Sequence, residues 1–211
     1  MSEKELVTQK CIDDIEDRVK GVFNDLKAYI YIRNNRLQHT IDDIGGGNMV
    51  TALSLFTALN FLAKAYYCTM RSDKFNPDGS SINETESFIH FMKFIQKSGL
   101  DLGLPAKGDV LELVWSGFRD WLAHRLTVQP GKQVLAFTFE VDIKNTVAES
   151  LAYAKTHKVF QDDGNGRNWI VNCDVLLSFL PDIVKITMEH IKNKKDIDND
   201  LLLKVIGTEY P

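Results

Sequence analysis

The hydrophobic and polar positions of the chain follow helical spacing over most of its length. Over residues 8–36, apolar residues recur three or four positions apart and charged residues occupy the opposite side, which predicts a long amphipathic helix. Similar spacing predicts further long helices over 49–70, 83–97, 108–126 and 175–191, and short ones over 143–154 and 201–206. In the helix over 83–97, we expect four residues to face the core: Phe88, Phe91, Met92 and Ile95.

The spacing changes to an alternation of two after the helix over 108–126. Residues 133–141 alternate in this way and predict a strand. The segment Asp162-Asp163-Gly164-Asn165-Gly166 lies between two apolar runs and predicts a β-hairpin. The sequence therefore predicts a mainly α protein: an up-and-down bundle of four to five long helices, with a small antiparallel β-sheet inserted before the last long helix.

The length of 211 residues and an apolar content of 44% are typical of one globular domain. We expect a single domain over 1–211, with the β insert at about 133–172. A polar linker and a short helix would complete it over 192–211. The apolar run over 49–67 is interrupted by threonine, serine, asparagine and lysine, so we interpret it as a core helix and expect no membrane partner.

Charge and cysteine content limit the class of protein. The net charge of −4 argues against a broad basic surface that grips duplex nucleic acid, so any such contact would use a few cations in a cleft. Cys11, Cys68 and Cys173 are odd in number and lack the spacing of a zinc site, which argues against a disulfide framework and against zinc. The charged N-terminus does not resemble a signal peptide, and we expect reduced cysteines and a cytoplasmic location.

The segment from Arg119 to His124 carries the most informative candidate chemistry. It places Arg119, Asp120 and His124 inside an apolar helical run, where charged residues are rarely buried unless they are paired. His124 could act as a general base or acid near pH 7, and Arg119 could hold a phosphate through its guanidinium group. Asp120 lies four residues before His124, on the same helix face, and could fix its tautomer. This combination points to phosphodiester chemistry.

Arg119 and His124 lie roughly 140° apart around a helix axis, so one helix would not easily aim both at one atom. Two copies of the helix that face each other could do so, which predicts a homodimer. The alternative interpretation is an Arg119–Asp120 surface pair, with His124 interacting with the dipole at the helix C-terminus. That alternative describes a helical interaction protein without catalytic function.

The Arg119-Asp120-x3-His124 segment resembles the R-x4-6-H motif of the HEPN (higher eukaryotes and prokaryotes nucleotide-binding) domains. The resemblance covers the helical residues 8–126 and 173–192, and the Gly-Gly-Gly-Asn lead at 45–48 is similar to that of uncharacterised bacterial proteins of this group. It implies a HEPN-like bundle that dimerises to bring two motifs to one cleft, and a toxin-like, metal-independent endoribonuclease. It also implies, as alternatives, a non-catalytic nucleotide- or RNA-binding or protein-interaction scaffold, and a nucleotidyltransferase-type antitoxin as partner.

Three further residues are candidates for substrate binding: Arg125, Arg33 and Asn48. Arg33 belongs to a second, looser match, Arg33-Asn34-x4-His39, for which a solvated helix end is the alternative. We expect no metal and no cofactor. Among the other histidines, we interpret His90 as a half-buried bundle residue and His157 and His190 as isolated and solvated.

Overall fold

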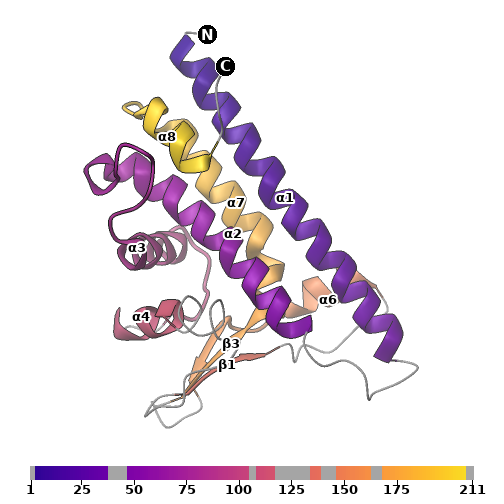
Figure 1. Ribbon diagram of the computed structural model, residues 1–211. Coiled ribbons are helices and arrows are strands. Elements are labelled where there is room, and N and C mark those ends of the chain that lie inside the picture. The colour runs from indigo at the N-terminus through magenta and orange to yellow at the C-terminus, as the bar shows by residue number, and fades with distance from the viewer. Residues whose placement is uncertain are drawn as a thin grey trace. The chain divides into compact units, whose positions relative to one another are not determined.

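The computed structural model describes residues 3–37, 47–104, 108–116, 134–138, 146–162 and 168–207 (Figure 1). The longer helices are α1 (Glu3–Leu37), α2 (Gly47–Met70), α3 (Glu84–Lys97) and α7 (Cys173–Asn193). The shorter ones are η1 (Ser72–Lys74), α4 (Gly108–Ser116), α6 (Val147–Ala154) and α8 (Asn199–Ile206). The strands are β1 (Val134–Thr138), β2 (Phe160–Asp162) and β3 (Asn168–Asn172).

The chain divides into two compact units. The first, which we call the helical unit, contains residues 1–21, 57–100 and 182–211, and the second, the mixed unit, contains 22–56 and 101–181. The helices α1, α2 and α7 contribute residues to both units. The single domain expected over 1–211 stays a prediction.

In the helical unit, α3 has the amphipathic character that its sequence predicts. Phe88, Phe91, Met92 and Ile95 are fully buried, which confirms the predicted core face. Asn83 caps the first turn, because its side chain accepts a hydrogen bond from the backbone N–H of Glu86. The cap and the buried apolar stripe together explain why α3 begins and packs where it does.

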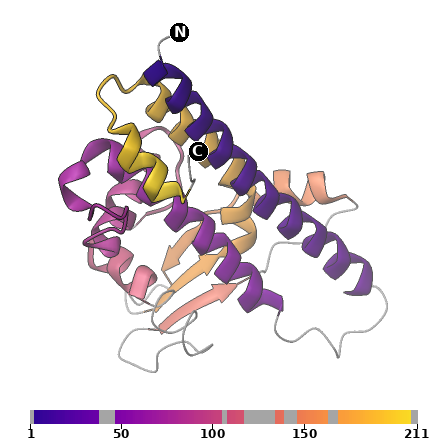
Figure 2. The same ribbon diagram turned by 45° about the horizontal axis from the view of Figure 1, so that its top comes forward.

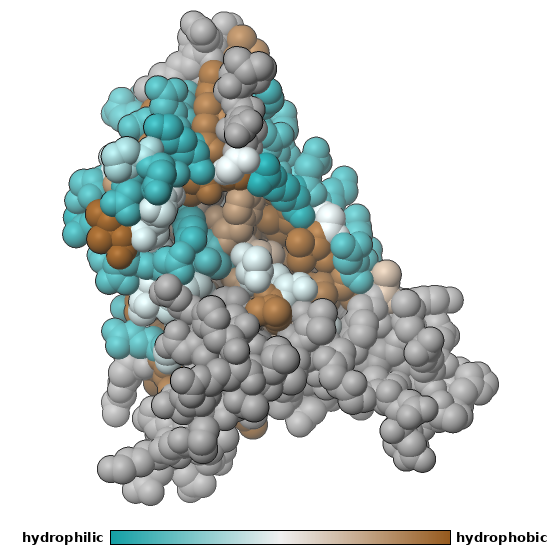
Figure 3. Space-filling view, in the orientation of Figure 1, coloured by the Kyte–Doolittle hydropathy of each residue, from teal (hydrophilic) through white to brown (hydrophobic). Residues whose placement is uncertain are grey.

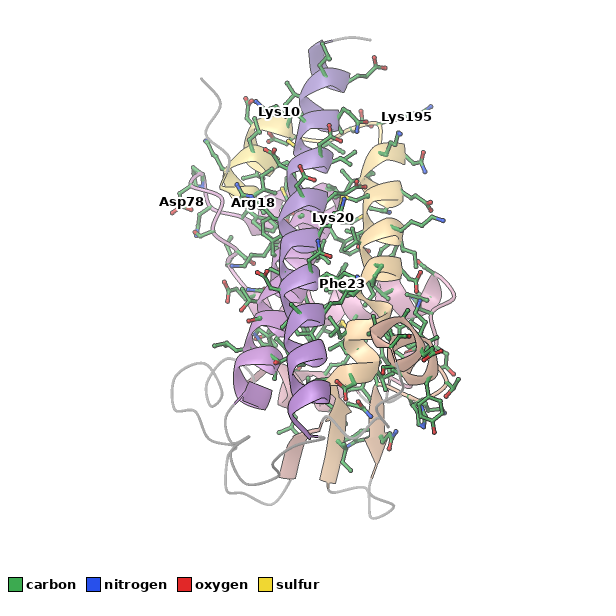
Figure 4. The ribbon with its side chains drawn as sticks, turned by 90° about the vertical axis from the view of Figure 1, so that its right-hand side faces the viewer. Lys10, Arg18, Lys20, Phe23, Asp78 and Lys195 are labelled. Atoms are coloured by element: carbon green, nitrogen blue, oxygen red, sulfur yellow. The ribbon has the colours of Figure 1, made fainter. Side chains whose placement is uncertain are left out.

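Helix α1 is also amphipathic, and hydrophilic residues follow its outer edge in Figure 3. Its buried side chains repeat at helical spacing: Cys11, Ile12, Ile15, Val19 and Leu26. Arg18 extends from α1 toward α8, as Figure 4 shows, and donates to the carbonyl oxygen of Ile206 at 2.6 Å. Its guanidinium also lies 5.8 Å from the ring centroid of Phe61. The hydrogen bond joins α1 to the C-terminal end of α8, and the ring contact joins α1 to α2.

The loop over 76–81 forms a tight turn that lies close against α8. The N–H of Gly79 donates to the carbonyl of Asn76, and the side chain of Asp78 accepts from both the backbone and the hydroxyl of Ser80. These hydrogen bonds from Ser80 lower the pKa of Asp78. Gly79 has a φ of +84°, and a Cβ added to it would meet the backbone of Lys204 at 2.6 Å. The close approach to α8 therefore requires glycine.

In the mixed unit, the three strands form one sheet in the order β1-β3-β2 (Figure 2). The pair β2–β3 is antiparallel, which confirms the predicted hairpin. The strand β1 pairs with β3 in parallel, with Phe137 opposite Val171, so the expectation of a purely antiparallel sheet was wrong. Parallel strands need a crossover connection, and the segment that contains α6 and β2 supplies it.

Helix α6 begins with a complete capping box. Thr146 accepts from the N–H of Glu149 at 3.1 Å, and the carboxylate of Glu149 accepts from the N–H of Thr146 at 3.1 Å. The helix ends near Ala154, as its spacing predicted. This boundary fixes where the chain turns back toward β2.

The coarse fold class is confirmed: the described residues are mainly helical, and a small sheet precedes α7. The finer HEPN-like bundle remains a proposal. None of the helices within the described ranges is both long and apolar enough to cross a bilayer.

Candidate functional site

The residues of the sequence motif lie outside the described part of the chain. Arg119, Asp120, His124 and the neighbouring Arg125 all fall within residues 117–133, for which no structure is described. The arrangement predicted for these four side chains therefore stays a prediction.

The other two predicted substrate contacts lie on helices whose backbones are described. Arg33 belongs to the last turns of α1, and Asn48 is the second residue of α2. Their side chains are outside the description, so the predicted substrate contacts stay predictions as well.

Helix α4 leads directly toward the motif. Val110, Leu111, Val114 and Trp115 are buried, whereas Glu112 is exposed. This first part of the predicted helix over 108–126 is therefore amphipathic and anchored in the mixed unit.

A second candidate site lies around His190 in the helical unit. The imidazole ring packs against Tyr66 of α2 and Phe94 of α3, with ring centroids 4.9 and 5.0 Å away. Tyr66 and Phe94 are themselves stacked, with centroids 4.3 Å apart and planes 16° apart. Three helices thus bring three rings into one cluster, and the interpretation of His190 as an isolated, solvated residue was wrong. The same interpretation was wrong for His157, whose half-buried ring lies 4.9 Å from that of Tyr153.

An open hollow of about 380 Å³ adjoins this cluster. From α3, Phe94 and Ser98 line it, and α7 with the residue after it supplies Ile186, Glu189, His190, Asn193 and Lys194. We call this the His190 hollow. Its lining combines the rings of Phe94 and His190 with polar and charged side chains.

The electrostatics of the hollow keep the imidazole neutral. Burial lowers the pKa of His190, and the nearby charge of Lys194 lowers it further. The Nε2 atom of His190 is buried and has no hydrogen-bond partner within the described residues. Burial also raises the pKa of Tyr66, so both rings are uncharged near neutral pH.

Sequence reasoning missed this site because its residues come from three separate helices. One signal was present: Ile183, Thr187 and His190 recur at helical spacing, and the first two are fully buried. That spacing places His190 beside the inward stripe of α7 rather than on its solvated side.

A polar contact joins α2 to α3 elsewhere in the helical unit. The hydroxyl of Tyr67 donates to the carboxylate of Glu86 at 2.6 Å. Burial and this carboxylate raise the pKa of Tyr67 to about 12. The ring of His90 lies 5.3 Å from that of Tyr67, but the residue is exposed, so the expectation that it is half-buried was wrong. The contact is a structural tie between the two helices.

The three cysteines are buried and free, which confirms the prediction that they form no disulfide. Burial raises the pKa of the thiol to about 11 at Cys11 and about 12 at Cys68, and it also raises the pKa of Cys173. Thiols with such values are not nucleophiles at neutral pH. Within the described ranges, no three side chains of His, Cys, Asp or Glu gather closely enough to hold a metal ion.

Comparison with known proteins gives no match to a family model, to a curated protein or to a solved structure.

Proposed function

We propose that the protein is a dimeric, metal-independent endoribonuclease of the HEPN type. The observation that carries this proposal is the spacing of Arg119, Asp120 and His124 in the apolar segment that follows α4. The mainly helical character of the described residues supports it, since the resemblance is to a helical domain. RNA is the proposed substrate, and a nucleotidyltransferase-type antitoxin is a proposed partner.

The proposed mechanism is an intramolecular transesterification. His124 takes the proton of a ribose 2′-hydroxyl, and the 2′-oxygen attacks the adjacent phosphorus. A bond forms between the 2′-oxygen and phosphorus, and the bond from phosphorus to the 5′-oxygen breaks. The leaving oxygen takes up a proton, which leaves a cyclic phosphate on one product and a 5′-hydroxyl on the other. Arg119 stabilises the negative charge that builds on the phosphate, and Asp120 orients the imidazole.

Cleavage of a labelled RNA in EDTA tests this proposal. General acid–base catalysis contributes about 10²–10⁴-fold, so His124→Ala should lose that much activity. Arg119→Ala should lose about 10²–10³-fold, as removal of a charge-stabilising donor does. His157→Ala and Arg71→Ala are matched controls, because His157 contacts Thr156 and Arg71 pairs with Asp73. Unchanged cleavage by His124→Ala would contradict the assignment, and RNA binding without cleavage would favour the scaffold.

The dimer can be tested through complementation. If each site takes His124 from one subunit and Arg119 from its mate, a mixed dimer of His124→Ala and Arg119→Ala contains one intact site. Random mixing should then restore about one quarter of the native activity. No recovery would contradict a shared site, and a strict monomer by light scattering would contradict the dimer itself.

A further inference from the structure

We propose that the His190 hollow binds a small aromatic carboxylate, whose ring packs on Phe94 and His190 and whose carboxylate is held by Lys194 and Asn193. This site uses none of the residues of the Arg119/His124 motif. A binding experiment at the His190 hollow can therefore fail or succeed independently of the proposed nuclease activity.

The size and floor of the hollow suit a planar ring. Its volume of about 380 Å³ lies within the range of small-molecule sites. Phe94 is only half-buried although it stacks on Tyr66, so part of its apolar surface remains open to an incoming ring. Aromatic rings favour offset or edge contacts with one another, and His190 already makes an edge contact with Phe94. An aromatic ligand would extend this cluster by one ring.

The charged groups at the rim favour an anion. The ammonium of Lys194 has the sulfur of Met70 as its one hydrogen-bond partner among the described residues, at 3.7 Å, and sulfur is a weak acceptor. Asn193 is exposed and offers two amide donors. Lys97 and Lys192 lie outside the lining, in the last turns of α3 and α7, and add positive charge to these helix ends. A carboxylate would give Lys194 a stronger acceptor than the sulfur of Met70.

The negative charge near the hollow favours a ligand with one negative charge over a ligand with two. Glu189 also lines the hollow, and it is only weakly paired with Lys185, at 4.0 Å. Ser98 at the C-cap of α3 and Asn193 at the end of α7 both line the hollow, and the C-termini of helices carry partial negative charge. A dianion such as a phosphomonoester would be repelled more strongly than a carboxylate. The hollow therefore fits a ring that carries one carboxylate.

Titration of the full-length protein with indole-3-acetate, followed by NMR of the histidine ring protons, tests the site. We expect a saturable shift at His190 and no comparable shift at His157. Tryptophol lacks the carboxylate and cyclohexylacetate lacks the aromatic ring, and each should bind about tenfold more weakly. Equal binding of either analogue, or no saturable shift at His190, would overturn the proposal.

Two variants localise the contacts. Lys194→Gln should weaken the binding of indole-3-acetate about tenfold. Lys195→Gln makes the same charge change at the next residue, which does not line the hollow, and it should leave binding unchanged. Lys195 is labelled in Figure 4. Phe94→Leu keeps an apolar side chain and removes the ring, so it should also weaken binding. Equal effects of Lys194→Gln and Lys195→Gln would show that only net charge matters and would overturn the assigned site.

Discussion

Replacing Gly79 with alanine tests how tightly the loop over 76–81 is held against α8. The φ of +84° is unfavourable for an L-residue and costs about 1–2 kcal/mol. The added Cβ would also lie 2.6 Å from the carbonyl carbon of Lys204 and 2.7 Å from the nitrogen of Val205. Both atoms are backbone, so the loop must move away by most of an ångström to reach an ordinary contact distance.

The steric cost of the added Cβ and the cost of the unfavourable φ add together in the loss of stability. Overpacking of a well-fitted contact costs about 1–3 kcal/mol, so we expect Gly79→Ala to lower the free energy of unfolding by about 2–5 kcal/mol in total. Gly207→Ala is the matched control: Gly207 has a φ of +64°, but no heavy atom lies within 4 Å of the added Cβ. Gly207→Ala should lower the free energy of unfolding only by the cost of the unfavourable φ, about 1–2 kcal/mol.

Urea denaturation followed by far-UV circular dichroism measures both free energies from the midpoint and the slope m. We expect a lower midpoint for Gly79→Ala than for Gly207→Ala, with similar m values. Equal destabilisation of the two variants would refute the reasoning, because it would mean that the backbone contact between the loop and α8 contributes nothing.

Three further predictions concern stability and are checked by the same denaturation assay. Gly21→Ala should stabilise the protein by about 0.5–1 kcal/mol, because the added Cβ on α1 meets nothing within 4 Å; a loss of stability would contradict this. Thr146→Ala should cost about 1 kcal/mol, because it removes the capping box of α6, and no change would refute that role. Burial lowers the pKa of His190 in the folded protein, so on acidification its imidazole takes up a proton more readily in the unfolded chain. The free energy of unfolding should therefore fall as the pH drops below about 6.5. His190→Gln should reduce this pH dependence, and an unchanged slope would count against the buried imidazole.

Most helices could be predicted from the sequence because their information is local. In α3, the cap at Asn83 and the stripe that begins at Phe88 specify both the start and the inward face. The same holds for the hairpin, where the turn residues between β2 and β3 predict its position. Helix ends were less predictable: α1 begins at Glu3, several residues before its apolar stripe becomes regular.

What could not be predicted depends on residues far apart in the chain. Alternation identifies β1 as a strand but contains no information on its direction, which is set by the crossover through α6. The surroundings of His190 come from Tyr66 and Phe94 on other helices, so no local pattern describes them. The proposed convergence of Arg119 and His124 involves a second copy, and spacing within one chain can suggest it but not establish it.

The position of β3 at the centre of the sheet has a consequence for synthesis on the ribosome. Both β1 and β2 pair with β3, and β3 is the last of the three to be translated. Two strands therefore leave the ribosome with their edges exposed and must wait for the third. We expect nascent chains that stop before Asn168 to depend on chaperones, and chains that extend beyond Asn172 to be able to close the sheet.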